Sequence, residues 1–455
     1  MTKKLIDKYN VPVPRYTSYP PANFFHPNFT EKEYFDAIEE SNHSLPQHIS
    51  FYIHIPFCRH LCHYCGCNSF PMMKQEERDR YIKALFLEIK RIKPLLNKER
   101  KIAQIHYGGG TPTLLPVDLL KEINELLLDG FELIESPEIA IECHPGYLDE
   151  RYWEELTQAH FNRFSLGIQD FNNKVLQAVN RRPSLLPVEE IIEILRSANA
   201  RINMDFIYGL PLQTTAGFSE TIDKAIALRP DRLVTFSYAH VPWVSKRQLL
   251  LERVGLPSDQ TKKELFEEAS KRLLAANYNA IGMDHFVQEE DELYLALQEN
   301  QLHRNFQGYC TKRTTGQVYA FGVTGISQLS SAYIQNTKSV EEYVDRVENG
   351  QFPIARGYQL SSEQQITKAV IDALMCNYTL EWEKLASQLQ ITKEEVVQAL
   401  RFNKKELGDF VKDGIIQLTD SRLSITPRGK LFVRNVAASL DKLMINTTKK
   451  FSKPV

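Results

Sequence analysis

The stretch FYIHIPFCRHLCHYCGCNSF, residues 51–70, places four of the chain's seven cysteines within ten residues. The cluster directly follows an apolar, β-branched run at 50–57, which predicts a buried strand. Ligands of parallel sheets bind just beyond the carboxyl ends of the strands. The position of the cluster therefore indicates a functional site after the first strand of an α/β fold.

The spacing of the cysteines allows two interpretations. On a helix, Cys58, Cys62 and Cys65 would share one buried face and act as small hydrophobic residues. Pro56 and Gly66 bracket the run, and both residue types disfavour a helix. We therefore interpret the cluster as a loop that carries metal or redox chemistry.

Three kinds of thiolate site could use such a loop. Structural zinc sites usually join two ligand pairs separated by a longer loop, and no second pair follows here. A redox Cys-x-x-Cys formed by Cys62 and Cys65 leaves the other two cysteines without a role. A short thiolate-rich loop suits an iron–sulfur cluster best, and three ligands on four irons would leave one iron open.

Five further runs rich in β-branched and aromatic residues alternate with helical patterns, which predicts six β-α units around a largely parallel sheet. They lie at 102–108, 138–144, 163–169, 202–208 and 232–239. Apolar residues three or four apart from Tyr81 to Leu96 predict the first helix on this sheet. Six units would form a partial barrel, and eight would close it if the runs at 279–286 and 318–326 also count.

From about residue 360 the pattern of apolar and polar residues changes, and it predicts helical segments, a hairpin-like stretch at 415–429 and a last helix. This pattern is typical of a small helical domain that resembles a winged helix. We expect an N-terminal arm at 1–48 over the active site, a catalytic barrel at 49–357 and a C-terminal helical domain at 358–455.

The composition argues against several classes of protein. Lys and Arg number 55 against 57 Asp and Glu, which gives no reason to expect a nucleic-acid-binding or lipid-binding surface. No segment approaches the roughly 20 apolar residues that cross a bilayer, and the N-terminus lacks a signal-peptide pattern. An odd, clustered set of cysteines differs from a secreted disulfide framework. We expect a cytoplasmic protein without a membrane span.

The spacing Cys58-x-x-x-Cys62-x-x-Cys65, with Tyr64 before the third cysteine, resembles the signature of radical S-adenosylmethionine enzymes. With Cys67, the string YIHIPFCRHLCHYCGCN resembles one branch, the oxygen-independent coproporphyrinogen III oxidases, also called dehydrogenases. The likeness continues through KYNVPVPRYTSYP, GGGTPT, LGIQDF, DFIYGLP, SYAHVP, IGMDHF, HRNFQGY and LFVRNV. It implies a partial (β/α)6 barrel, a [4Fe–4S] cluster on the first three cysteines, and a catalytic Cys67.

The resemblance also implies two bound S-adenosylmethionine molecules. One, on the cluster, would contact Tyr52, Gly109, Glu142 and Ile326. The second would contact Tyr64, Gly110, Thr111, Gln169, Arg181, Asp205 and Ala239. One string departs from the family, which more often shows Glu-x-Asp-Pro-Arg where this chain reads Glu142-Cys143-His144-Pro145-Gly146.

The implied substrate carries four propionates, and arginines bind carboxylates through paired hydrogen bonds. Arg15, Arg304 and Arg434 lie in matching strings and are candidates, with Phe306 and Gln307 facing the reacting site. By the resemblance, the reduced cluster cleaves S-adenosylmethionine to methionine and a 5′-deoxyadenosyl radical, which removes a hydrogen from a propionate. Loss of carbon dioxide and one electron leaves a vinyl group. Two such reactions would convert coproporphyrinogen III to protoporphyrinogen IX in anaerobic haem biosynthesis.

Two alternatives share this fold. One is another radical S-adenosylmethionine oxidoreductase that acts on a tetrapyrrole, and the other is a haem chaperone without this activity. Cys67, the RYTSYP arm and the string NFQGYC favour the oxidase. We expect a monomer that takes electrons from a donor such as flavodoxin or ferredoxin and has no nucleic-acid partner.

Overall fold

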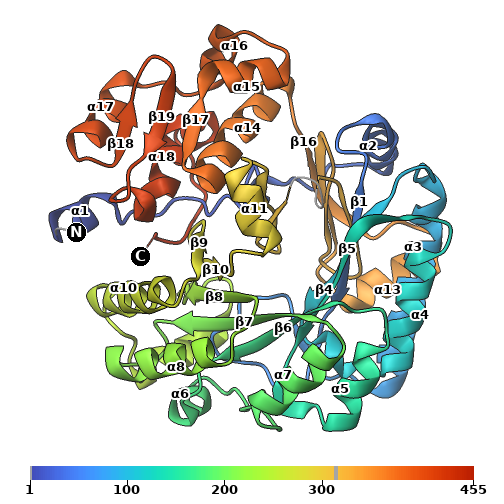
Figure 1. The fold of residues 1–455 in the computed structure, drawn as a ribbon. Helices are drawn as coiled ribbons and strands as arrows, with labels where there is room; N and C mark the ends of the chain where they lie inside the picture. The colour runs from blue at the N-terminus through green and yellow to red at the C-terminus, as the bar shows by residue number, and fades with distance from the viewer. Residues whose placement is uncertain (1–2, 312–315, 455) are drawn as a thin grey trace.

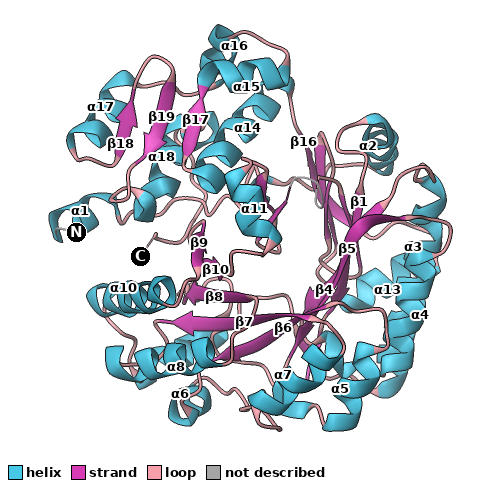
Figure 2. Cartoon of the chain, viewed as in Figure 1, coloured by secondary structure: helices cyan, strands magenta, loops and turns pink. Residues whose placement is uncertain are grey.

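The computed structural model describes residues 3–311 and 316–454. Its main feature is a twelve-stranded sheet in the order β16-β15-β14-β13-β1-β4-β5-β6-β7-β8-β10-β9 (Figures 1 and 2). The six strands predicted from sequence are neighbours in it and run parallel: β1 (Ile49–Ile55), β4 (Ile102–Gly109), β5 (Leu133–Cys143), β6 (Arg163–Gln169), β7 (Arg201–Tyr208) and β8 (Arg232–Ser237). The helices between them are α3 (Gln75–Ile92), α4 (Val117–Leu128), α5 (Glu150–Thr157), α6 (Asn173–Ala178), α7 (Val188–Ser197) and α8 (Thr215–Ala227).

The two predicted runs that could have closed the barrel each contain an antiparallel reversal at its edges. After α9 (Leu249–Val254) and α10 (Asp259–Ala275), β9 (Asn279–Ile281) and β10 (His285–Val287) pair antiparallel beside β8. On the other side, β13 (Val318–Phe321) runs parallel to β1, and β14 (Ile326–Gln328), β15 (Ala332–Asn336) and β16 (Ile354–Gln359) continue antiparallel. A chain that turns straight back cannot add a β-α unit. The six-unit partial barrel is confirmed, and the eight-unit alternative is wrong.

Helix α3 packs one apolar face on the sheet, as its spacing predicts. Tyr81, Leu85 and Ile89 are fully buried, and burying a side chain of this size contributes about 1.5–3 kcal/mol. The α-helix ends at Ile92, earlier than the apolar pattern, because Pro94 cannot donate the next backbone hydrogen bond. Among the described residues, no helix has the length and apolar character needed to span a bilayer.

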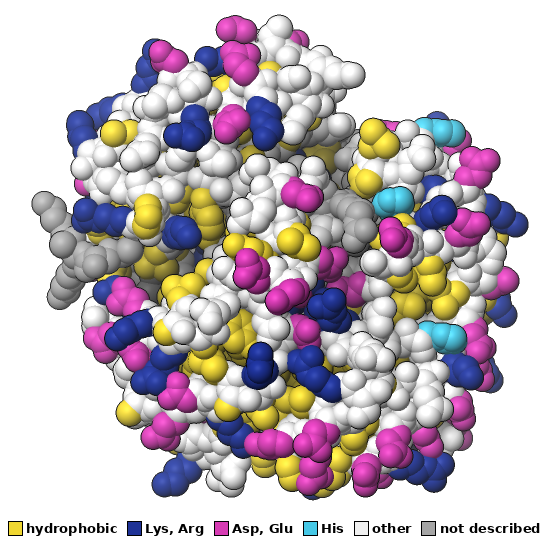
Figure 3. Space-filling view, in the orientation of Figure 1, with side chains coloured by type: hydrophobic (Ala, Val, Ile, Leu, Met, Phe, Trp, Pro, Cys, Tyr) yellow, Lys and Arg dark blue, Asp and Glu magenta, His cyan; other side chains and the backbone are white. Residues whose placement is uncertain are grey.

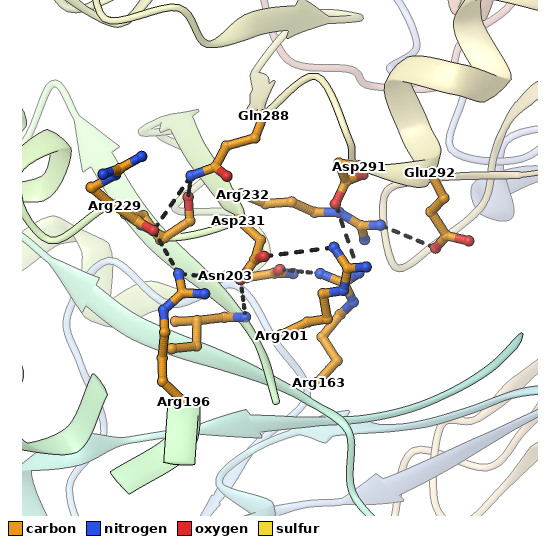
Figure 4. Close-up of polar contacts among 12 residues, drawn as sticks. Arg163, Arg196, Arg201, Asn203, Arg229, Asp231, Arg232, Gln288, Asp291 and Glu292 are labelled. Carbon is orange, nitrogen blue, oxygen red and sulfur yellow. Dashed lines mark hydrogen bonds and ion pairs between the residues drawn. The ribbon is translucent and has the colours of Figure 1, made fainter. Parts of the chain in front are cut away.

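Charged side chains fill the barrel at the amino ends of its strands (Figure 4). Arg163 Nε lies 2.6 Å from Glu138 Oε2, and Arg232 Nε lies 2.8 Å from Asp291 Oδ2. Arg232 Nη2 also reaches Glu292 Oε1 at 3.0 Å, which ties α11 (Glu292–Gln298) to the barrel. Removing one partner of such a buried pair typically costs 3–5 kcal/mol. This network closes the base, opposite the strand ends that carry the cysteines.

A second buried core joins the two ends of the chain (Figure 1). Tyr9, Tyr16 and Phe25 of the N-terminal segment pack with the C-terminal helices, and Tyr16 donates to Asp441 Oδ2 at 2.9 Å. The C-terminal elements are α14 (Ser362–Asn377), β17 (Thr379–Glu381), α15 (Trp382–Leu389), α16 (Lys393–Ala399), α17 (Lys404–Lys412), β18 (Ile416–Leu418), β19 (Arg422–Ile425) and α18 (Val433–Leu440). The described residues also form α1 (Lys3–Tyr9), α2 (Glu31–His43), α13 (Val340–Glu348) and the short strands β2 (Phe57–Cys58), β3 (Phe70–Pro71), β11 (Leu302–Arg304) and β12 (Tyr309–Thr311). The expected bounds of the three domains stay a prediction.

Candidate active site

Two short paired strands hold the cysteine loop, residues 58–69, above the end of β1. These strands, β2 (Phe57–Cys58) and β3 (Phe70–Pro71), pair parallel, and the Phe70 amide donates to the Pro56 carbonyl at 2.7 Å. No part of the loop is helical, so the helical interpretation of the cysteines is wrong. Cys62 is buried, Cys58 and Cys65 are half-buried and Cys67 is exposed.

The thiols of the loop lie close enough to perturb one another. A hydrogen bond with Cys67 lowers the pKa of Cys65 to about 6, and the same contact raises the pKa of Cys67. Burial raises the pKa of Cys58, whose sulfur accepts a hydrogen bond from Thr111 Oγ1 at 3.5 Å. Across residues 3–311 and 316–454, no three His, Cys, Asp or Glu side chains meet around one point as ligands of a single ion would. Thiolates on a multi-iron cluster bind separate irons, and Cys58, Cys62 and Cys65 on one short loop are a donor set of that kind.

Arg181 links the cysteine loop to the end of β6. Its Nη1 donates to Cys62 Sγ at 3.6 Å and to the Tyr64 hydroxyl at 3.2 Å, and its Nη2 donates to the Gly167 carbonyl. Gln169, the last residue of β6, has a φ of +69°, and its side chain lies against Gly167 beside Arg181. The structure therefore brings Tyr64, Gln169 and Arg181 together.

The glycine-rich end of β4 lies directly beneath the cysteine loop. The Gly110 amide donates to the Ile55 carbonyl at 2.7 Å, and the Thr111 amide donates to the Phe57 carbonyl at 2.8 Å. A Cβ on Gly110 would lie 2.7 Å from the Phe57 carbonyl oxygen, so only glycine permits this approach. Gly109 has a φ of +106°, a conformation that glycine adopts without strain.

Polar side chains of five strands point into the barrel above its base. His106 Nε2 and Glu142 Oε1 are 3.1 Å apart, and the Tyr52 ring stacks on His106 with a centroid distance of 6.0 Å. Ser165 Oγ donates to Asp205 at 2.6 Å, while burial, with the nearby Glu142 charge, raises the pKa of Asp205 to about 6. Tyr52, Glu142 and Asp205 are thus gathered as expected. His106 was not predicted as a site residue, although strand alternation places it on the same face as Gly108, which lies beside Glu142 and Tyr52.

The remaining two cofactor candidates lie on different sides of the barrel mouth. Gln248 Nε2 donates to the carbonyls of Tyr64 at 2.9 Å and Ala239 at 3.2 Å, which ties the loop after β8 to the cysteine loop. Sequence analysis did not single out Gln248, because a lone glutamine carries no motif. Ile326 is the first residue of β14, which lies on the β13 side of β1, whereas Ala239 follows β8 on the other side of the sheet. The Ile326 side chain is half-buried and packs against the second core.

The three candidate arginines come from distant segments and converge. Arg15 Nη2 lies 3.6 Å from Asp284 Oδ2, and Arg304 on β11 (Leu302–Arg304) donates to the Tyr309 hydroxyl of β12 (Tyr309–Thr311) at 3.2 Å. Burial, together with the positive charges of Arg15 and Arg304, lowers the pKa of Arg434 to about 9. Such mutual repulsion places a positive field where a carboxylate would bind.

Arg434 differs from the other two in its partners. Its guanidinium donates to the main-chain carbonyls of Pro14 at 3.0 Å, Lys453 at 3.0 Å and Ser452 at 3.0 Å, and also to Val13. In this arrangement it joins the N-terminal arm to the C-terminal segment. A carboxylate at Arg434 would have to displace one of these carbonyls.

A cavity of about 510 Å³ opens between the barrel rim and the C-terminal helices. Arg15, Ala239 and Arg434 line it, together with Lys262 and Lys430, two cations without a motif to mark them in the sequence. Figure 3 shows apolar side chains gathered in this hollow, with basic and acidic side chains interspersed over the surrounding face. The cavity offers aromatic surface and positive charge to a large carboxylated molecule.

The string HRNFQGY forms the turn between β11 and β12. Phe306 packs edge-on against Tyr333 with centroids 6.3 Å apart. The Oε1 atom of Gln307 is buried, and within the described residues it has no hydrogen-bond partner. A buried amide oxygen without a partner is costly, so Gln307 is suited to bind a ligand donor.

The departure at His144 has a local explanation. Its Nδ1 accepts the Gly146 amide at 3.1 Å, the contact that an aspartate makes in the same turn. Burial lowers the pKa of His144 to about 2, so the ring is neutral and can accept this hydrogen bond. A side chain on Gly146 would collide with the Pro183 carbonyl, so this chain has no room for an arginine there.

Comparisons with known proteins agree with this site. Residues 52–225 match the description of the radical SAM superfamily. The chain is similar to the oxygen-independent coproporphyrinogen III oxidase of Synechocystis, with 37% identity over 98% of this chain and 96% of the relative. It is 36% identical to the Escherichia coli enzyme of that name over 96% of this chain and 94% of the relative. The solved structure of coproporphyrinogen III oxidase from Escherichia coli, described as a radical SAM enzyme, matches with a TM-score of 0.89 and 34% identity over 97% of this chain and 99% of that one.

Proposed function

The chain belongs to the oxygen-independent coproporphyrinogen III oxidases of the radical SAM superfamily, and from this we propose that it decarboxylates two propionates of coproporphyrinogen III oxidatively, giving protoporphyrinogen IX. The observation that carries the proposal is the cysteine loop at the mouth of the six-unit barrel, in a chain that matches these oxidases over nearly its full length. The enzyme is then a radical SAM oxidoreductase of porphyrin biosynthesis.

The residues of the loop fit a [4Fe–4S] cluster held by Cys58, Cys62 and Cys65. Bound there with S-adenosylmethionine, a reduced cluster supplies a 5′-deoxyadenosyl radical, which is the hydrogen acceptor that this chemistry needs. The Cys67 contact that lowers the pKa of Cys65 favours the thiolate form, which is the form that binds iron. The Thr111 hydroxyl stabilises the Cys58 thiolate by donating to its sulfur.

The polar groups around the mouth suit two S-adenosylmethionine molecules. The carboxylates of Glu142 and Asp205 are placed to bind cationic amino groups, and Arg181 can bind a carboxylate beside Cys62. These groups lie on β5, on β7 and after α6, and this spread supports one molecule on the cluster and a second beside it. The role of Cys67 as a catalytic residue, outside the ligand set, belongs to the same proposal.

The arginine convergence supports a substrate with several carboxylates. Arg15 and Arg304 flank Asp284, which holds their charges in place until a propionate binds. Burial raises the pKa of Asp284, but the hydrogen bond with His285 and the charges of His285, Arg304 and Arg15 together lower it to about 2, so Asp284 is ionised at neutral pH. The aromatic walls of the cavity exclude water from a bound tetrapyrrole.

Anaerobic turnover tests the proposal against a haem chaperone of the same fold. Reconstituted protein, S-adenosylmethionine, coproporphyrinogen III and a reductant should yield vinyl product, methionine and 5′-deoxyadenosine. Haem binding without decarboxylation would contradict the proposal. We further propose a monomeric cytoplasmic enzyme that takes its electron from a flavodoxin or ferredoxin.

A further inference from the structure

The outer side of the cysteine loop carries a basic patch that the substrate site does not use. The patch consists of Arg59, His60, Tyr147, Arg182, Pro183 and Leu185. Arg59, His60, Arg182, Pro183 and Leu185 are exposed, and Tyr147 is half-buried beneath them. Tyr147 belongs to the short turn of 3-10 helix Pro145–Tyr147 that follows β5.

Tyr147 organises the cations of this patch. The guanidinium carbons of Arg59 and Arg182 lie 5.2 Å and 5.5 Å from the centre of its ring, within the range of cation–π attraction. His60 stacks on the same ring at 5.9 Å, and its Nδ1 lies 2.7 Å from the Tyr147 hydroxyl. Two arginines and a histidine are thereby fixed around one aromatic side chain and remain open to solvent.

The patch lies directly over the segment that would hold the cluster. Arg182 directly follows Arg181, whose Nη1 donates to Cys62 Sγ at 3.6 Å, and His60, which stacks on Tyr147, lies two residues before Cys62. Asn180 Nδ2 donates to the Leu61 carbonyl at 3.0 Å, and the His63 amide donates to the Val179 carbonyl at 2.9 Å. These bonds join the patch rigidly to the loop at Cys62.

The two sides of the loop differ in what they face. His54 Nε2 lies 3.0 Å from the Asn68 carbonyl and its Nδ1 lies 3.1 Å from the Tyr52 hydroxyl, so the end of the loop that carries Cys67 faces the barrel interior. Cys62 lies on the side of Arg181, whose Nη1 donates to its sulfur. An electron could therefore enter from the Cys62 side while substrate and cofactor occupy the other.

We propose that this basic patch is the docking surface for an acidic one-electron carrier protein of the flavodoxin class. The inference rests on the proposed function, because only a redox-active loop needs such a partner. Charge complementarity selects the partner: exposed Arg59 and Arg182 lie around Tyr147, next in the chain to exposed Pro183 and Leu185, whereas the whole chain is nearly neutral, with a net charge of −2. Transient redox complexes use small, electrostatically steered interfaces of this kind.

Charge reversal tests the proposal. Arg59→Glu with Arg182→Glu should slow reduction of the reconstituted cluster by a reduced flavodoxin about tenfold at low salt, because steering depends on the charge at the interface. At about 0.5 M salt the difference from wild type should fall below about twofold, since the Debye length shrinks to a few ångströms. The milder pair Arg59→Gln with Arg182→Gln should fall between the two. Lys404→Glu with Lys412→Glu on α17 is the matched control and should reduce like wild type.

Reduction by a photoexcited deazaflavin, a small neutral reductant that needs no docking site, separates the two proposals. If wild type reduced by deazaflavin cleaves no S-adenosylmethionine, the proposed function fails. If it does cleave it, and the reversed variant accepts electrons from flavodoxin at the wild-type rate at low salt, the docking surface is wrong. Equal slowing with flavodoxin and deazaflavin would also refute it, because the substitutions would then act on the cluster itself.

Discussion

Substituting Gly110 tests whether close backbone contact holds the cysteine loop in place. A methyl group at Gly110 would lie 2.7 Å from the Phe57 carbonyl oxygen and 2.7 Å from the Pro56 carbonyl carbon. Both atoms belong to the backbone, and the Phe57 oxygen accepts the Thr111 amide, so they cannot move without loss of that bond. Overpacking of this kind costs about 1–3 kcal/mol, and we expect about 2 kcal/mol for Gly110→Ala.

Gly66 supplies a matched control inside the same loop. A methyl group there would meet no atom within 4 Å, so Gly66→Ala should change stability by less than about 0.5 kcal/mol. Thermal unfolding of the apoprotein measures both variants, and Gly110→Ala should melt about 2 °C lower. Gly110→Ala should also bind less iron on reconstitution, because the Thr111 to Phe57 bond supports Cys58. A Gly110→Ala protein that melts like Gly66→Ala and binds full iron would refute the reasoning.

Three other predictions address the thiols, a buried acid and the substrate site. Cys62→Ala should abolish the visible cluster absorbance after anaerobic reconstitution, whereas Cys67→Ala should keep it and lose turnover; equal losses would contradict the three-plus-one assignment. Burial raises the pKa of the Glu88 carboxyl from 4.5 to about 7. The protonated carboxyl therefore stabilises the fold fully below pH 4.5, and about 3 kcal/mol of this stabilisation is lost as the pH rises through 7. Glu88→Gln should flatten that dependence in denaturant titrations, and the exposed Glu76→Gln on the same helix should leave it unchanged. Arg15→Met should raise the KM for coproporphyrinogen III about tenfold, because it removes a charged hydrogen-bond donor, while leaving S-adenosylmethionine cleavage intact; an unchanged KM would remove Arg15 from the substrate site.

Local patterns were sufficient to predict the main elements. The six parallel strands, the first helix and the non-helical cysteine loop follow from alternation, periodicity and the positions of Pro56 and Gly66, all of which act within a few residues. The run at 318–326 was ambiguous because a buried strand and a tight antiparallel turn use the same apolar residues. Gly322, with a φ of +97°, sits where that chain reverses.

The sequence by itself determined the chemistry: a short loop of thiols after a buried strand requires only the spacing of Cys58, Cys62 and Cys65 along the chain. The tertiary structure decided which distant groups surround that loop. Only folding brings Arg181 to Cys62, joins Arg15 to Asp284 across 269 positions, and gathers Arg59 and Arg182 around Tyr147. Such contacts depend on how strands and helices pack in space, and the residues that make them follow no repeating spacing in the sequence.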